Sequence, residues 1–362
     1  MERYKKILEE ASKTKLEAIN IWYSLFKTGD DPFNQIVPVE NTSYFVNQNK
    51  IIEEIIFDIG ISKRNIPISI FLVSPTKGGK TSLFQYIKTV IKKVKQIENF
   101  DMQINIEYVD LEENPENQDS TYLYELSNKK NIDAVFFDNI KRPSQIKSYA
   151  INLPNIRMKA YAISPFILDE SLEIIENLPK IYYIKKLNQK EIYQVLDERL
   201  NLNKQNNSSF ELKNLFFEEA LTAIHKYSFG VPYLALRLAS ESFKIQYEKK
   251  LEFNKHNEKR KITKDLVLLA AKRCGSYYAL HNLEKLTSKK NELLTNIMKI
   301  GTTNPTQLSK LLNKDRTTIS RHVSDFNNLN LLSYKIIGRE AIFSLTEAVK
   351  IKLSIDKMKE WG

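Results

Sequence analysis

Five short apolar runs lie between residues 68 and 184, and each is separated from the next by a stretch in which apolar residues have helical spacing. The runs cover residues 68–73, 103–110, 133–138, 159–164 and 181–184. Such runs are typical of strands buried on both faces, and intervening helices let successive strands run parallel. The pattern predicts an α/β fold with a mostly parallel sheet and helices on both of its faces.

Helical spacing dominates outside this region. Apolar residues recur every three or four positions from residue 1 to about residue 26, and again in several segments between 188 and 286. Asn188 and Glu191 have the spacing of a capping box, in which each side chain accepts a hydrogen bond from the backbone of the other. We therefore expect a helix to begin directly after Asn188, where the strand pattern stops.

The C-terminal segment has a third pattern. Segments with helical spacing begin near Asn291, Pro305 and Arg316, and two strand-like runs follow at 332–337 and 341–345. Three helices followed by a hairpin are the order of a winged helix–turn–helix. The predicted domains are an N-terminal helix and linker (1–35), an α/β core (36–187), a helical domain (188–286) and a winged helix (287–362).

Composition narrows the class of protein. The 362 residues are too many for one compact core, and 42% hydrophobic with 27% charged residues excludes disorder of the whole chain. No apolar run approaches the ~20 residues that a membrane-spanning helix needs. Cys274 is the single cysteine, which excludes an internal disulfide framework. The N-terminal residues do not resemble a signal peptide, so we expect a cytoplasmic protein.

The chain is basic, with 55 Lys and Arg residues against 44 Asp and Glu, a net charge of +11. Lysine and arginine side chains gain free energy when they release counterions from phosphate, so this excess favours a polyanionic partner. Biased codon usage explains a chain rich in Lys, Ile and Asn equally well. The net charge alone does not distinguish a polyanionic partner from biased codon usage.

A candidate phosphate-binding loop follows the first apolar run. It consists of Ser74, Pro75, Thr76, Lys77, Gly78, Gly79, Lys80, Thr81 and Ser82. Glycines let backbone N–H groups turn inward and approach phosphates before a helix begins. Lys80 would then reach the β- and γ-phosphates of ATP, and the Thr81 hydroxyl would bind Mg²⁺. Ser74 stands where the usual pattern has its first glycine, and a serine can still make that turn.

The third run ends in a candidate magnesium residue. Asp138 follows two phenylalanines, as in strands whose terminal carboxylate holds magnesium through water. Active ATPases of this type usually have a glutamate next, which polarises the attacking water, whereas this chain has Asn139. An amide can orient a water but cannot accept its proton. Hydrolysis should be slow or absent unless another carboxylate serves, first Asp110, then Glu112 or Glu113.

Two further positions fit a nucleotide site. Ser164 ends the fourth run, where a small polar residue could sense the γ-phosphate, and Pro232 begins a helix that would lie over the nucleotide. Each alone is nonspecific, because a serine at a strand end and a proline at a helix start are common.

The third helix of the C-terminal segment would expose polar and basic side chains suited to the major groove of duplex DNA. The candidate DNA-binding residues on this helix, the preceding turn and the wing are Lys314, Arg316, Thr317, Thr318, Ser320, Arg321, Lys335 and Arg339. Winged helices also mediate protein contacts, in which case these residues form a solvated face. Their presence on turn, helix and wing together favours DNA.

Over about residues 36 to 250, these motifs resemble the AAA+ superfamily. Within it, the chain looks most like archaeal ATPases that end in a winged helix, including origin-recognition initiators and the related signal-transducing (STAND) ATPases. The resemblance implies bound ATP and Mg²⁺, adenine near Val46 and a helical lid. Tyr233 replaces the usual lid arginine, and Arg237, one turn later, could stand in for it. No arginine lies between Ser164 and Ile184, and these departures weaken a claim of subunit-coupled hydrolysis.

Three functions remain open. The first is a DNA-binding ATP switch that self-associates on DNA, with replication initiation or mobile-element maintenance implied by the resemblance alone. The second is a STAND-like regulator of transcription or signalling, although its usual sensor repeats are missing. The third is a scaffold that holds nucleotide without turnover.

Overall fold

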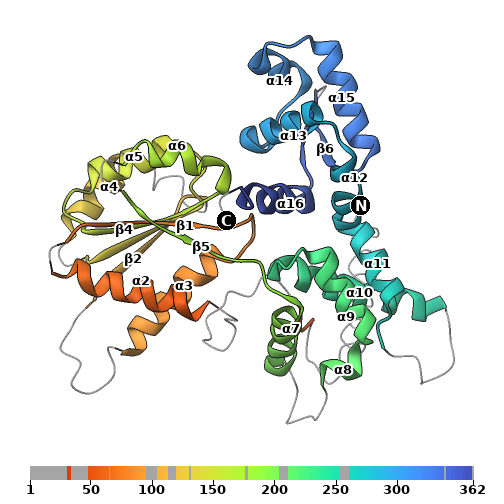
Figure 1. Cartoon of the computed structure of the whole chain (residues 1–362), viewed down its shortest axis with the longest axis horizontal. Coiled ribbons are helices and arrows are strands. Elements are labelled where there is room, and N and C mark those ends of the chain that lie inside the picture. Colours follow the sequence, from red (N-terminus) through yellow and green to blue (C-terminus); the bar gives the residue numbers. More distant parts are fainter. Residues whose placement is uncertain are drawn as a thin grey trace, which may run out of the picture. The chain divides into compact units, whose positions relative to one another are not determined.

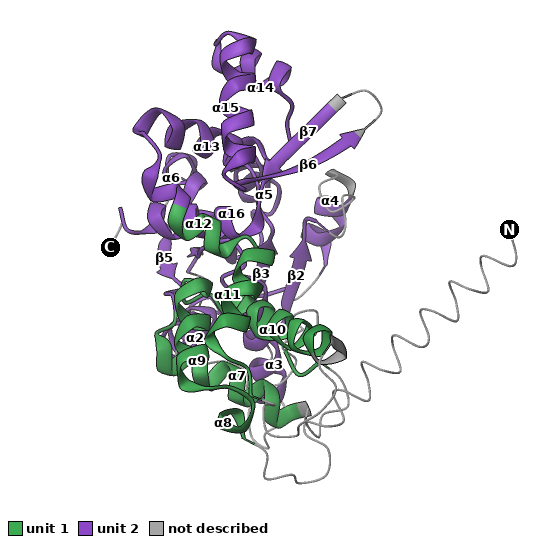
Figure 2. Ribbon diagram, turned by 90° about the vertical axis from the view of Figure 1, so that its right-hand side faces the viewer, with its two compact units in different colours: residues 1–37, 187–281 green, residues 38–186, 282–362 purple. Residues whose placement is uncertain are grey.

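The computed structural model describes residues 31–33, 48–64, 66–94, 104–112, 120–129, 132–175, 178–203, 211–252, 261–337 and 340–360. Contacts between residues divide the chain into two compact units. Unit 1 comprises Met1–Val37 and Leu187–His281, and unit 2 comprises Pro38–Lys186 and Asn282–Gly362 (Figure 2). The four predicted domains stay a prediction, and the phosphate loop and the winged helix belong to the same unit.

Unit 2 contains the predicted parallel sheet. Its five strands run in the order β2-β3-β4-β1-β5, and every neighbouring pair is parallel. The strands are β1 (Ile68–Val73), β2 (Ile106–Asp110), β3 (Ala134–Asp138), β4 (Met158–Ile163) and β5 (Lys180–Tyr183). Each of the five apolar runs forms a strand, which confirms the predicted α/β class.

Helices cover both faces of this sheet (Figure 1). On one face, Leu83, Phe84 and Ile87 pack with strand residues such as Phe136, whereas Tyr149 on the other face stacks on Phe137 with 4.5 Å between ring centroids. Successive strand residues point to opposite faces, so both faces must be apolar. The helices are α2 (Asn49–Ser62), α3 (Lys80–Val94), α4 (Ser120–Asn128), α5 (Pro143–Asn152), η3 (Pro165–Ile167) and α6 (Leu168–Leu172).

The C-terminal part of unit 2 is a winged helix, as predicted. Asn304 caps the second helix by accepting the Gln307 N–H at 2.8 Å, and Asp315 caps the third by accepting the Thr318 N–H at 3.0 Å. The elements are η4 (Leu283–Lys285), α13 (Ser288–Ile300), α14 (Pro305–Leu312), α15 (Arg316–Asn328) and the antiparallel pair β6 (Leu332–Ile337) and β7 (Glu340–Leu345). A further helix, α16 (Glu347–Met358), follows the hairpin and was not expected from the sequence.

Unit 1 is helical in its described part. The predicted capping box forms, because the Asn188 N–H donates to Glu191 at 2.7 Å and the Glu191 N–H donates to Asn188 at 3.0 Å. Phe33 is fully buried and lies 5.8 Å from Phe216 and 5.7 Å from Phe243, measured between ring centroids. The helices are α7 (Gln189–Asn203), α8 (Leu212–Leu215), α9 (Glu218–Ser228), α10 (Pro232–Glu252), α11 (Lys264–Arg273) and α12 (Ser276–Asn282).

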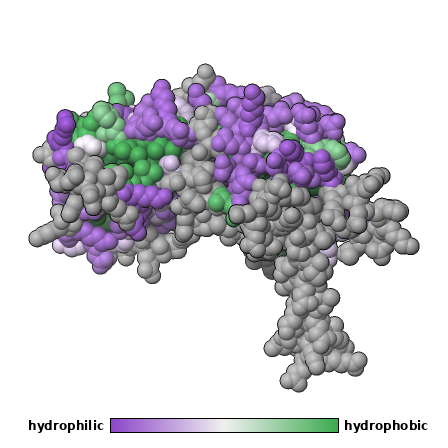
Figure 3. All heavy atoms as spheres, turned by 90° about the horizontal axis from the view of Figure 1, so that it is seen from below, coloured by the Kyte–Doolittle hydropathy of each residue, from purple (hydrophilic) through white to green (hydrophobic). Residues whose placement is uncertain are grey.

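On the face drawn in Figure 3, most of the described surface is hydrophilic, with one larger apolar area at the left and smaller ones elsewhere. Among the described residues, no helix combines the length and the apolar character needed to cross a bilayer.

Candidate functional site

The carboxyl ends of β1, β3 and β4 bring three predicted site residues to one edge of the sheet. Ser74 follows β1, Asp138 ends β3 and Ser164 follows β4. Because the strands are parallel and β4 pairs with both neighbours, these ends lie on the same side. Open α/β sheets bind ligands at this edge.

The loop between β1 and α3 requires its two adjacent glycines. A Cβ atom on Gly78 would lie 2.8 Å from both the Pro75 carbonyl oxygen and the Ser74 Oγ, closer than such atoms approach. Gly79 has φ +97°, a conformation that side chains disfavour. Lys77 also has a positive φ, of 58°. The loop is therefore tightly wound just before α3 begins at Lys80, and a helix N-terminus attracts anions.

Lys80 is held against this loop by Ser74. The Lys80 ammonium group donates to the Ser74 hydroxyl at 3.0 Å and to its carbonyl oxygen at 3.5 Å. The serine at the usual glycine position thus supplies an acceptor for the lysine. Burial lowers the pKa of Lys80 to about 8, although the charge of Asp138 opposes this effect and Lys77 adds to it. Bound phosphates would raise this pKa again, because a nearby opposite charge favours the charged form.

Thr81 and Asp138 meet beside Lys80. The Thr81 hydroxyl donates to Asp138 Oδ2, and the Tyr108 hydroxyl donates to the same oxygen at 2.8 Å. Asp138 is 1% exposed. Burial and the negative charge of Asp138 raise the pKa of Tyr108, so its hydroxyl stays protonated. The sequence did not single out Tyr108; alternation along β2 puts it on the face of Asp110 but does not predict its contact.

These oxygens suit a magnesium ion bound with nucleotide. Mg²⁺ prefers oxygen ligands and usually combines one or two protein groups with phosphate oxygens and water. The described residues include no group of three or more His, Cys, Asp or Glu side chains that could hold a metal ion. A magnesium site here would therefore depend on Thr81, Asp138 and the phosphates together, and the tight loop fits the same ligand.

Asn139 contacts the carboxylate that was expected to compensate for the missing glutamate. Its side-chain N–H donates to Asp110 Oδ1 at 2.9 Å, and its backbone has a positive φ of 60°. Asp110 and Asp138 are register partners on β2 and β3. Glu112 forms an exposed ion pair with Lys141 at 3.5 Å, and Glu113 lies outside the described residues.

Three of the four remaining predicted nucleotide residues lie in the part of the chain that the structure describes. Ser164 caps η3 by accepting the Phe166 N–H at 3.4 Å, so its side chain has a local structural role. Ser82 is half-buried in the first turn of α3, and Pro232 begins α10 in unit 1. Val46 lies outside the described residues.

The loop also contacts the C-terminal helix, which no sequence motif indicated. The Thr76 hydroxyl lies 3.1 Å from the Ser354 hydroxyl on α16. Ser354 is fully buried and donates to the Lys350 carbonyl oxygen at 2.8 Å, so Thr76 is the donor between the two hydroxyls. The phosphate loop and the winged-helix segment are thereby in direct contact within unit 2.

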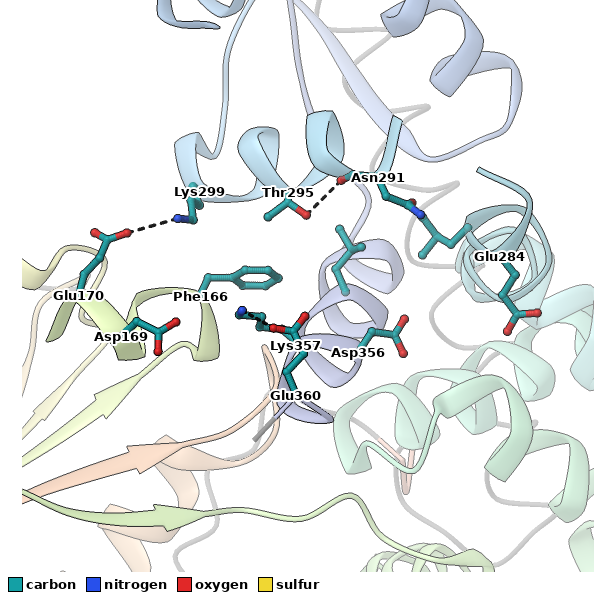
Figure 4. Close-up of a pocket in the computed structure, with 12 residues that line it drawn as sticks. Phe166, Asp169, Glu170, Glu284, Asn291, Thr295, Lys299, Asp356, Lys357 and Glu360 are labelled. Carbon is teal, nitrogen blue, oxygen red and sulfur yellow. Dashed lines mark hydrogen bonds and ion pairs between the residues drawn. The ribbon is translucent and has the colours of Figure 1, made fainter. Parts of the chain in front are cut away.

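A separate cavity of about 500 Å³ lies between α6, α13 and α16 (Figure 4). Lys299 of α13 forms an ion pair with Glu170 of α6 at 3.3 Å across it. Its charged lining residues are Asp169, Glu170, Glu284, Asp356, Glu360, Lys299 and Lys357. Carboxylates outnumber lysines here, so a phosphate ligand is expected at the loop and not in this cavity.

Most of the predicted DNA-binding residues are exposed on α15, on the turn before it and on β6. Arg316, Ser320 and Arg321 are exposed on α15, while Ile319 and two other apolar residues bury its opposite face. Thr317 donates to the capping residue Asp315, and Thr318 is half-buried. Lys314 and Lys335 are exposed on the turn and on β6. Arg339 lies outside the described residues.

Comparisons with known proteins give distant similarities. No protein-family model matches the chain. An uncharacterized HTH-type transcriptional regulator of Methanocaldococcus jannaschii is 26% identical over 193 residues, which are 52% of this chain and 44% of that protein. This chain therefore spans less than half of that relative's length.

Similar solved structures include an ORC1 protein and a Cdc6p protein. ORC1 of Aeropyrum pernix in complex with DNA is 10% identical over 91% of this chain and 95% of that chain, with a TM-score of 0.48. Cdc6p of Pyrobaculum aerophilum is 10% identical over 90% of this chain and 98% of that chain, with a TM-score of 0.46. Both TM-scores are below 0.5.

Proposed function

We propose that this protein binds ATP with Mg²⁺ at the loop of residues 74–82 and duplex DNA through its winged helix, and that nucleotide acts as a switch between the two. The observation that carries the proposal is the hydrogen bond between Thr76 in the loop and Ser354 on α16. A loop that moves when phosphate binds would disturb this bond. Replication initiation or mobile-element maintenance would follow only from the sequence resemblance.

At the nucleotide, each residue has a distinct task. Lys80 would leave Ser74 to neutralise the β- and γ-phosphates, and the N-terminus of α3 would face the same charge. Thr81 would bind magnesium directly and Asp138 through water. Magnesium, when bound, neutralises phosphate charge and orients the phosphates. Ser164 would lie near the γ-phosphate, and Pro232 would belong to the lid.

At the DNA, α15 would enter the major groove. Ser320 is suited to base edges, and Arg316 and Arg321 to base edges or phosphates. Lys314 and Lys335 would bind the backbone on either side, with Arg339 at the wing. The capping role of Thr317 and the half-buried position of Thr318 make both weaker candidates than the neighbouring arginines.

The proposal is tested by selecting bound fragments from random duplex DNA with and without ATP. We expect a common sequence among the bound fragments and an affinity that changes when ATP is added. No enrichment in either condition would rule out sequence-specific DNA binding. If the enrichment is the same with and without ATP, the protein binds DNA but nucleotide does not act as a switch.

The switch is expected to weaken when Ser354 is replaced by alanine. The substitution removes a hydrogen bond that contributes about 1 kcal/mol, so the ratio of DNA affinities with and without ATP should fall by up to about fivefold. Ser242→Ala is a matched control, because Ser242 is also fully buried in a helix and donates to the carbonyl oxygen four residues earlier, at 2.7 Å. Equal ratios in the wild type and Ser354→Ala would contradict the proposed coupling.

ATP turnover is expected to be slow and to depend on Asp110. Asp110 would accept the proton of the attacking water, which Asn139 would orient while it is bound to that carboxylate. Asp110→Asn should reduce phosphate release by about 100-fold, at the lower end of what a positioned base contributes, and leave ATP binding intact. Glu112→Gln is the control at an exposed carboxylate of the same segment.

Phosphate release also separates the enzyme from the scaffold. If the wild type releases no more phosphate than a Lys80→Ala variant, the protein holds nucleotide without turnover. A role as a transcription regulator is the second candidate, favoured by the name of the Methanocaldococcus relative. Fragments selected mainly from promoter regions in a genomic version of the experiment would support that alternative.

A further inference from the structure

Tyr108 reaches the candidate magnesium residue from the neighbouring strand. Its hydroxyl donates to Asp138 Oδ2 at 2.8 Å, and the Asn139 backbone N–H donates to Oδ1, also at 2.8 Å. Tyr108 pairs with Phe136 in the register of β2 and β3, two residues before the strand ends that carry Asp110 and Asp138. The ring lies beside the core packed between the sheet and α3, the helix that carries Thr81.

The two bonds fix both oxygens of the carboxylate. Thr81 also donates to Oδ2, but Thr81 is itself the expected magnesium ligand. Tyr108 and the Asn139 N–H hold Asp138 without being ligands. Groups that hold metal-binding side chains in this way set the orientation of the ligand, and their loss typically lowers metal affinity 10- to 100-fold.

We propose that Tyr108 is a positioning residue for magnesium: it aims the Asp138 carboxylate at the water shell of the ion that accompanies the nucleotide. This inference rests on the proposed binding of ATP with Mg²⁺. The half-buried ring could pack equally well as phenylalanine, so the hydroxyl is the part of the side chain that the inference concerns.

The test is Tyr108→Phe, which removes one oxygen atom and keeps the ring. ATP affinity is measured by calorimetry in EDTA and then at increasing Mg²⁺ concentrations. We expect the ATP affinity of the variant in EDTA to equal that of the wild type. Mg²⁺ should increase the ATP affinity of both proteins, but the Mg²⁺ concentration that gives half of this increase should be about tenfold higher for the variant. A purely structural role would lower the melting temperature and leave this concentration unchanged.

The sheet offers a matched control in Tyr182→Phe. Tyr182 lies on β5, and its hydroxyl donates to the fully buried carboxylate of Asp58 at the same 2.8 Å distance. This variant should keep the wild-type dependence on Mg²⁺. An unchanged dependence in Tyr108→Phe, or an equal shift in both variants, would overturn the inference. If the wild type itself binds ATP no better with Mg²⁺, the proposed magnesium site fails, and the inference fails with it.

Discussion

Lys80→Ala is expected to weaken ATP binding by at least about 100-fold in the presence of Mg²⁺. The variant loses charge-assisted hydrogen bonds to the phosphates worth about 1.5–3 kcal/mol each, and tenfold in affinity corresponds to about 1.4 kcal/mol. Ser74, which accepts a hydrogen bond from this ammonium group, is neutral and cannot replace its charge. Calorimetry with ATP and Mg²⁺ measures the effect directly.

The control for this variant is Lys88→Ala. Lys88 lies on the same helix, α3, and is exposed, so its loss removes one positive charge without touching the loop. Its ATP affinity should stay within about twofold of the wild type, as for an exposed charge in water. Equal affinities for wild type and Lys80→Ala would show that residues 74–82 are not the phosphate site. The protein would then be a basic winged-helix protein without a nucleotide switch.

Reversing the charges of Arg316 and Arg321 to glutamate is expected to weaken duplex binding by about 100-fold or more, because two hydrogen bonds to charged groups contribute at least about 3 kcal/mol. The slope of log affinity against log salt should also become shallower by about one unit for each phosphate that the variant no longer neutralises. Both side chains are exposed at the start and middle of α15. A salt titration of binding to a selected duplex measures both effects.

A second pair of basic residues controls for net charge. Lys92 and Lys93 are exposed in the last turn of α3, far along the sequence from the winged helix, and their reversal changes the net charge by the same amount. Duplex affinity should fall much less in this control. A similar loss in both double variants would mean that total charge alone drives binding. Unchanged affinity in the arginine variant would exclude α15 as the DNA-reading helix and favour a protein partner for this face.

Together, the two experiments separate the halves of the proposal. If Lys80→Ala abolishes ATP binding but keeps the DNA affinity measured without ATP, the two ligands bind at separate sites. The loop–α16 contact is then the proposed coupling between these sites. Only then does the Ser354→Ala variant report on coupling. A Lys80→Ala protein that also loses ATP-free DNA binding would instead indicate that the loop is needed for the integrity of unit 2.

Local patterns in the sequence were sufficient to predict the five strands of the sheet and the three helices of the winged helix. The five apolar runs became the five strands because a strand buried on both faces needs apolar residues at nearly every position. Helices begin after Asn188, Asn304 and Asp315. Each of these side chains accepts a hydrogen bond from the backbone N–H three residues later, which is a local interaction. The helix α16 was not predicted; Thr346 stands at its N-cap position, but the Thr346 side chain makes no capping hydrogen bond.

What only the tertiary structure decided is which distant residues meet at the carboxyl edge of the sheet. The sequence by itself was enough to predict Lys80, Thr81, Asp138 and Asn139 as site residues, because each belongs to a short motif or to the end of a strand. The contact of Tyr108 with Asp138 spans 30 residues, and that of Thr76 with Ser354 spans 278. Such pairs depend on strand order, register and the packing of α16, and none of these is specified by the spacing of residues within one segment.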